Sequence, residues 1–211
     1  MGAAINSLCP LIGISKPISE TTLIITISAI VLFLCFMCYL RNKNYSKSFS
    51  IDTDGVVFSP FILYLLLLPF LAIFGAYLLN YYNNNLLLLV LLAVVSVIPV
   101  LIAFDKIPSD IYPFAIWIIS ISLLLHNSLI GYYVSWGDAS AEYTFSKLVL
   151  TSGFWDNTLP STTNSLLSIT MLHPIYSLVC NMELTWVFKI VYPFLFSLVP
   201  VALYIAFKKQ T

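Results

Sequence analysis

Residues 61–79 read FILYLLLLPFLAIFGAYLL, an apolar stretch without a single charged side chain. A helix rises about 1.5 Å per residue, so about 20 apolar residues cross a hydrocarbon core about 30 Å thick. Lipid offers no partner for backbone N–H and C=O groups, so such a segment must be a helix and not a strand. The stretch therefore predicts a transmembrane helix, and Pro69 is compatible with it because lipid-buried helices tolerate proline.

Other stretches of similar length and character flank this one. The fourth span in chain order ends in Tyr132 and Tyr133, and Trp136 follows, as is typical of an aromatic belt at the membrane interface. We predict an all-α integral membrane protein, a bundle of about five transmembrane helices. The predicted spans are 23–40, 61–79, 86–104, 111–133 and 185–207, and the predicted parts are 1–136 (four spans), 137–184 (a long outer loop) and 185–211 (the fifth span and a basic tail).

The composition excludes a water-soluble domain. Hydrophobic residues make up 60% of the chain and charged residues 9%, whereas a soluble domain carries about 25% charged residues. The nine basic and nine acidic side chains give a net charge of zero, which argues against nucleic acid as a partner, because binding to phosphates needs a basic excess. The predicted partner is the lipid bilayer.

The basic residues predict the orientation. Five spans place the two ends of the chain on opposite sides, and the positive-inside rule puts the Lys-rich and Arg-rich side in the cytoplasm. With the N-terminus outside, Lys16 and Lys147 lie outside, and Lys189 falls in the last span. Six basic residues then lie inside: Arg41, Lys43, Lys47, Lys106, Lys208 and Lys209. We therefore expect a cell-membrane protein with its N-terminus outside and its C-terminus in the cytoplasm.

This orientation places the long loop on the outer face. Long connections are where function tends to lie. Within the loop Ala141, Phe145, Leu148 and Val149 recur at helical spacing, which predicts an amphipathic helix on the membrane surface. A second apolar patch, 166–182, contains Pro174 and several polar residues, so we expect one or two interfacial helices here and not a sixth span.

The strongest candidate for chemistry is an acidic pair at the start of this loop. Asp138 follows the fourth span and suits the N-cap of a new helix. Glu142, four residues later, would lie on the same side of that helix. Two carboxylates at a membrane surface can act as a general base and a hydrogen-bond acceptor, or can share a divalent metal ion such as Mg²⁺ or Mn²⁺. The structural alternative is a capping Asp and a solvated Glu.

Three segments carry a resemblance to a known group of proteins. They are GDASAEY at 137–143, MLHPIYS at 171–177 and VFKIVYPFLFSLVPVALY at 187–204. The order of span, acidic pair, amphipathic loop and span resembles an archaeal family of multi-pass membrane proteins of unknown function that is related to the GT-C glycosyltransferases. The resemblance covers about the last hundred residues, and the first three spans match only in general character.

The resemblance implies a reaction and residue roles. GT-C enzymes transfer sugars from lipid-phosphate carriers on the outer face, so the implied substrate is a polyprenyl-phosphate-linked sugar. Asp138 would be the catalytic base or a metal ligand, and Glu142 its partner. His173 would lie near the acidic pair as a substrate-binding residue. Lys189 either attracts the phosphate of the carrier or reaches the outer headgroups for structural reasons.

GT-C enzymes have more spans than this chain, and often a soluble domain. We therefore expect the chain to be the N-terminal part of a longer protein, which needs that C-terminal part or a partner subunit for activity. The alternatives are a non-enzymatic assembly subunit of a membrane complex or a transporter component. Transport is the weaker of the two, because the second and third spans hold almost no polar groups.

Overall fold

A computed structural model of the chain describes residues 16–41, 60–104, 106–134 and 137–208. All regular structure in these residues is helical. Lys43, Lys47, Trp136 and Lys209, which the sequence analysis used, lie outside the described residues. The elements are α2 (Glu20–Arg41), α3 (Pro60–Tyr82), α4 (Leu86–Ala103), η2 (Ser109–Ile111), α5 (Tyr112–Ser128), α6 (Gly137–Ser152), α7 (Thr162–Ser165), α8 (Leu167–Thr170), α9 (Leu172–Val179), α10 (Leu184–Trp186), η3 (Val187–Val191) and α11 (Tyr192–Lys208).

In the described part of the chain, five helices are long and apolar enough to cross a membrane. They are Glu20–Arg41, Phe61–Tyr82, Leu86–Ala103, Ser109–Ser128 and Leu184–Lys208. Each matches one predicted span, so the predicted fold class is confirmed and the protein is a multi-pass membrane protein. Helix α2 carries Glu20 in its first turn and Arg41 in its last turn, with no formal charge between them. Each charge is favourable because it is opposite in sign to the partial charge of the helix dipole at that end.

The fourth span differs from its predicted limits. Its helix ends at Ser128, and the chain turns at Gly131, whose φ of 76° is accessible to glycine without strain. Tyr132 and Tyr133 therefore lie beyond the helix, and both are exposed. The prediction extended the helix to residue 133 because the apolar pattern continues past the point where the backbone turns.

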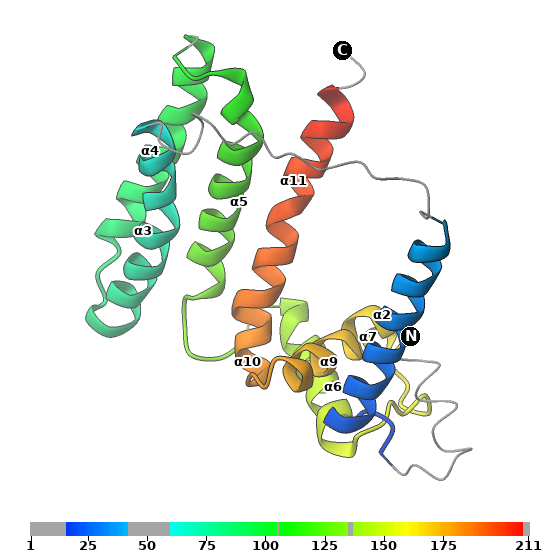
Figure 1. Cartoon of the computed structure of the whole chain (residues 1–211). Coiled ribbons are helices and arrows are strands. Elements are labelled where there is room, and N and C mark those ends of the chain that lie inside the picture. Colours follow the sequence, from blue (N-terminus) through cyan, green and yellow to red (C-terminus); the bar gives the residue numbers. More distant parts are fainter. Residues whose placement is uncertain (1–15, 42–59, 105, 135–136, 209–211) are drawn as a thin grey trace. The chain divides into compact units, whose positions relative to one another are not determined.

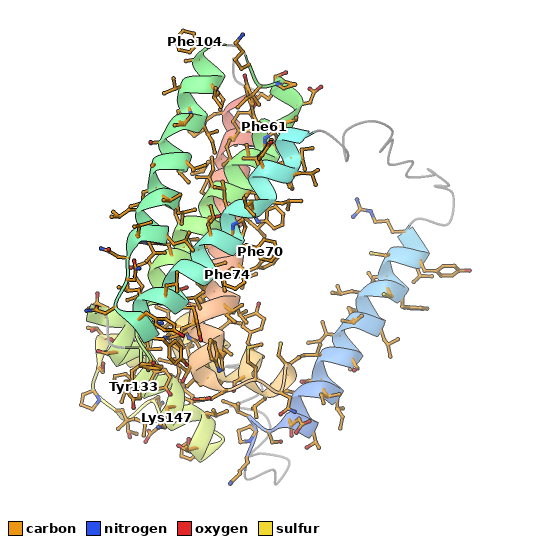
Figure 2. The ribbon with its side chains drawn as sticks, turned by 90° about the vertical axis from the view of Figure 1, so that its left-hand side faces the viewer. Phe61, Phe70, Phe74, Phe104, Tyr133 and Lys147 are labelled. Atoms are coloured by element: carbon orange, nitrogen blue, oxygen red, sulfur yellow. The ribbon has the colours of Figure 1, made fainter. Side chains whose placement is uncertain are left out.

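The described chain forms two compact units: unit 1 contains Met1–Ile51 and Val134–Val187, and unit 2 contains Asp52–Tyr133 and Phe188–Thr211. In unit 2, helix α3 packs against both α4 and α5, and α5 packs against α11 (Figure 1). Ser128 lies beside Lys189 and Trp117 beside Ser197, so α5 and α11 run in opposite directions. Figure 2 shows Phe61 and Phe104 at one end of unit 2 and Tyr133 at the other.

Small residues allow α3 and α4 to approach closely. Ala72 and Ala76 are buried, and a Cβ atom on Gly75 would lie 2.9 Å from Leu88 Cγ and 3.3 Å from Leu88 N. Because lipid tails are as apolar as these side chains, membrane helices associate through close packing and not through the hydrophobic effect. The absence of a side chain at Gly75 therefore makes this interface possible.

Unit 1 is built around a smaller apolar cluster. Ile18, Leu23, Val149 and Met171 form its buried centre. Leu23 belongs to the first turns of α2, and Ile18 N–H donates to Gly153 O at 2.7 Å. The start of the first span is therefore held against the C-terminal end of α6.

The predicted outer loop is largely helical. The stretch Leu167–Val179 is a shorter apolar helix, interrupted at Met171 where α8 ends and α9 follows. At about 1.5 Å per residue it is too short to cross the hydrocarbon core. The prediction that it is not a sixth span is confirmed, whereas its location at the membrane interface stays a prediction.

One face of α6 packs inside unit 1. Leu148 is 47% exposed, so the predicted position of this helix on the membrane surface stays a prediction. Ser146 and Val149 are buried, and Glu142 lies one turn before Ser146. The small polar residue Ser146 lies beside His173, a contact between distant parts of the chain that the spacing of apolar residues does not predict.

Candidate functional site

Helix α6 carries the acidic pair at its first turns. It begins at Gly137, whose φ is 44°, so Asp138 lies in the first turn and not at the N-cap as predicted. Ser140 Oγ donates to Gly137 O at 3.0 Å, and Thr144 Oγ1 donates to Ser140 O at 2.8 Å. A carboxylate in the first turn is still stabilised by the helix dipole, so Asp138 remains favourably placed at the start of α6.

The carboxyl group of Glu142 has a perturbed pKa. Its pKa is raised, first by partial burial and then by the negative charge of Asp138. Asp138 itself is exposed. The two side chains therefore interact as the i, i+4 spacing predicts. A carboxylate with a raised pKa is a stronger base than an ordinary glutamate, which suits proton transfer.

A hydrogen-bond chain next to the acidic pair joins α6 to α10. Thr185 Oγ1 donates to Glu183 Oε1 at 2.9 Å, and Tyr143 Oη lies 3.3 Å from Thr185 Oγ1. Thr185 has one hydroxyl proton, so Tyr143 must be the donor in the second bond. The sequence does not predict the contact of Tyr143 with Thr185, because the two residues are 42 positions apart and no pattern marks it.

His173 lies in the interior of unit 1. It is 1% exposed, and its Nδ1 is hydrogen bonded to Ile169 O, with Ser146 Oγ 3.4 Å from Nδ1. Since a carbonyl only accepts, Nδ1 carries the proton. Burial lowers the pKa of His173 to about 4, against an opposing effect of the bond to Ile169, so the ring is neutral at pH 7. Its predicted role in substrate binding stays a prediction.

Lys189 lies within unit 2, in the π-helical turn η3. Its side chain is 3% exposed, and its ammonium donates to Gly131 O. Ser128 Oγ donates to Lys189 O at 2.8 Å. The last carbonyls of a helix have no partner within the helix, and a cation near them is favourable. These contacts support the structural interpretation, in which Lys189 stabilises the turn after α5. The predicted binding of a carrier phosphate by Lys189 is untested.

Asn80 braces the same turn from α3. Its Nδ2 donates to Leu129 O at 2.9 Å, and its Oδ1 accepts from Gly131 N at 2.9 Å. Three helices of unit 2 thus meet at the turn 129–131. The sequence does not predict this role of Asn80, because an asparagine near the end of an apolar span indicates only that the span ends there.

A metal ion at the acidic pair would need ligands from elsewhere. No group of three or more His, Cys, Asp or Glu side chains that could hold a metal occurs among the described residues. Asp138 and Glu142 can supply two carboxylates. This donor set fits Mg²⁺ or Mn²⁺ only where water and substrate phosphates complete the shell, which is the usual arrangement for Mg²⁺ in phosphate chemistry.

Comparisons of the chain with protein-family models, with curated proteins and with solved structures give no match in any of the three.

Proposed function

We propose that this multi-pass membrane protein contributes the acidic site of a GT-C-like glycosyltransferase, which transfers a sugar from a polyprenyl-phosphate carrier. The observation that carries the proposal is the Asp138–Glu142 pair, with its exposed and half-buried members one turn apart on α6. The motif resemblance adds to this support. The helical segment 137–187 in unit 1 contains both carboxylates and the Tyr143–Thr185–Glu183 chain.

The two carboxylates take different parts in the proposed reaction. Glu142 accepts the proton of the acceptor hydroxyl, because burial and the charge of Asp138 raise its pKa. Asp138, at the exposed start of α6, is the better placed of the two to face a metal ion or the donor. A bound Mg²⁺ or Mn²⁺ would neutralise charge on the leaving phosphate.

Substrate binding by His173 and Lys189 stays a proposal. Both side chains are buried, and in the described structure they contact neighbouring groups of the protein. His173 positions Ser146 on the face of α6 that also carries Glu142, and Lys189 holds the turn after α5.

The test is sugar transfer from radiolabelled polyprenyl-phosphate sugars in membranes that contain the chain with its natural partners. We expect Glu142→Gln to lower the rate by about 10²–10⁴-fold, the range for loss of a general base. Asp110→Asn, which removes an exposed carboxylate of η2 in the other unit, is the matched control and should keep the rate. Equal rates for Glu142→Gln and the control would reject the catalytic role.

The pH profile separates the two carboxylates. Glu142 must be ionised to act as a base, so the rate should rise with pH through its raised pKa. Removing the charge in Asp138→Asn removes one of the two causes of that rise in pKa, so the increase in rate should move to lower pH. If the chain is instead an assembly subunit, replacing either carboxylate should not change the amount of membrane complex that forms.

A further inference from the structure

A pocket of about 320 Å³ opens in unit 1 beside the second half of α6. Phe145, Leu148 and Val149 line it from α6, and Phe154, Asp156 and Leu159 from the segment that follows. Its volume is at the lower end of the range for small-molecule sites.

The wall opposite α6 is fixed by one buried side chain. Asn164, 3% exposed, donates through Nδ2 to Asp156 O at 2.7 Å and to Leu159 O at 3.2 Å. Its Oδ1 accepts from Trp155 Nε1 at 3.1 Å. The segment 155–164 is therefore folded around Asn164, and the pocket is formed before any ligand enters it.

Most polar groups of the pocket are already used inside the protein. Thr151 Oγ1 donates to Lys147 O at 2.9 Å, and Ser152 Oγ donates to Phe154 O at 2.8 Å. The amide of Asn164 is bonded as described above. A sugar ring, which presents several hydroxyl groups, would find few partners here, and burying unpaired hydroxyls is costly.

Asp156 is the exception among the polar lining residues. Its Oδ1 accepts from Thr158 N at 2.8 Å and from Thr158 Oγ1 at 2.6 Å, and no hydrogen bond to Oδ2 occurs in the described part of the chain. The bonds from Thr158 lower the pKa of Asp156, so the carboxylate is ionised at neutral pH. Among the described residues, no Lys or Arg belongs to the lining of the pocket. Its chemistry is one fixed negative charge beside two aromatic rings and aliphatic side chains, which suits an ammonium group on an apolar stem.

The pocket lies at the end of a membrane span. Val149, which lines it, belongs to the same buried cluster as Leu23 of α2. Ile18, just before α2, is hydrogen bonded to Gly153 between the lining residues Ser152 and Phe154. Because α2 is a spanning helix, its first turn lies near the boundary between hydrocarbon and headgroups, where lipid ammonium groups are found.

We propose that this pocket holds the headgroup of phosphatidylethanolamine, with the ammonium on Asp156 and the apolar part of the headgroup against Phe145 and Phe154. A primary ammonium donates charge-assisted hydrogen bonds to a carboxylate, whereas the trimethylammonium of phosphatidylcholine has no N–H to donate. The site is separate from the acidic pair, and it holds whether or not the chain transfers sugar.

The test is native mass spectrometry of the full chain in detergent with phosphatidylethanolamine, phosphatidylcholine and phosphatidylglycerol of equal acyl chains. The wild-type chain should retain one phosphatidylethanolamine with a preference of about tenfold over phosphatidylglycerol, as one charge-assisted hydrogen bond allows. Asp156→Asn should abolish this preference, because the amide lacks the charge. Asp110→Asn removes the same charge from the other unit and should keep it.

Asn at position 156 retains an oxygen that can accept from Thr158, so the segment is expected to fold. Phe154→Ala, at a position 42% exposed, provides a second variant and should weaken retention of phosphatidylethanolamine several-fold. Retention of the preference in Asp156→Asn would overturn the proposal. Equal retention of phosphatidylethanolamine and phosphatidylcholine would also overturn it.

Discussion

His173 combines deep burial with a hydrogen bond that fixes its protonation. The ring donates from Nδ1 to Ile169 O and is held beside Ser146 in the interior of unit 1. A charged imidazole in this position would lose its hydration, which is why burial lowers its pKa to about 4. His173 is therefore a group whose ionisation is linked to the stability of the unit.

The stability of the protein should fall as the pH is lowered from about 6.5 to about 4. In this interval the unfolded chain binds a proton at residue 173 that the folded chain does not bind. Each pH unit between the two pKa values corresponds to about 1.4 kcal/mol, so the loss is of the order of 3 kcal/mol. Thermal unfolding in detergent across this pH range measures it.

His173→Asn gives the matched comparison, since its amide can donate to Ile169 O and does not ionise. This variant should show a flatter dependence of the unfolding midpoint on pH. His126→Asn removes the other histidine of the chain and should keep the slope of the wild type. Parallel slopes for the wild type and His173→Asn would contradict the assignment.

Asp138 and Glu142 show how different surroundings give two similar side chains different properties. Asp138 and Glu142 are both near the start of α6, yet Glu142 is half-buried and Asp138 is exposed. Burial, and then the charge of Asp138, raise the pKa of Glu142. Such a difference is how two residues of similar chemistry come to take different roles.

At the scale of elements, the hairpin of α3 and α4 depends on a missing side chain. Only Asn83, Asn84 and Asn85 connect the two helices, and Asn83 has a φ of 52°, a conformation that asparagine tolerates better than most residues. This short connection holds α3 and α4 close together where Gly75 faces Leu88.

Gly75→Val should destabilise this hairpin by about 1–3 kcal/mol, the usual cost of overpacking. The new side chain would meet both the side chain and the backbone N of Leu88. Chemical denaturation in mild detergent measures the change. Gly75→Val combined with Leu88→Ala should recover part of the loss, because the second change makes room for the first.

Phe74→Val tests whether the effect is specific to the interface. Phe74 is the neighbouring residue and is 59% exposed, and Figure 2 shows it on α3 among the side chains of unit 2. Its replacement should change the stability little. Equal destabilisation by Phe74→Val and Gly75→Val would mean that helix propensity, and not contact with Leu88, accounts for the result.

At the scale of the whole molecule, the two ends of unit 2 differ in character. One end carries the exposed tyrosines Tyr77, Tyr81, Tyr82, Tyr132 and Tyr133, with the rings of Tyr81 and Tyr132 6.0 Å apart. The other end carries Phe104 and the cations Lys106 and Lys208. Aromatic residues mark both membrane interfaces, but Lys and Arg mark the cytoplasmic one. Lys106 and Lys208, from separate spans of unit 2, thus lie at one end, whereas Lys189 is buried at the other end against Gly131.

Labelling of single cysteines tests the resulting orientation. In a chain whose four native cysteines are replaced, Tyr133→Cys should react with a membrane-impermeant maleimide in intact cells. Phe104→Cys should react only after permeabilisation, because it lies at the opposite end of unit 2 (Figure 2). Leu68→Cys, at a buried position within α3, is the unreactive control.

Labelling of both positions from the same side would contradict the spanning arrangement of α3, α4 and α5. Labelling of Phe104→Cys alone in intact cells would instead keep the spans and reverse the orientation that the basic residues predict.

The sequence by itself determined that this is a helical membrane protein, and it predicted the five spans found in the described part of the chain. Hydrophobicity and length are properties of each segment alone, and lipid leaves a spanning backbone no alternative to the helix. The same local logic placed Asp138 and Glu142 one turn apart, because the helical repeat fixes which residues are neighbours.

The tertiary structure decided what the local pattern leaves open. The end of α5, the buried face of α6, and the Tyr143–Thr185–Glu183 chain all depend on contacts between residues tens of positions apart. The same holds for the contact of Lys189 with Gly131, 58 residues away. Ser146 and Lys189 are buried polar side chains that need partners, and packing in space chooses the partner, which no period in the sequence records.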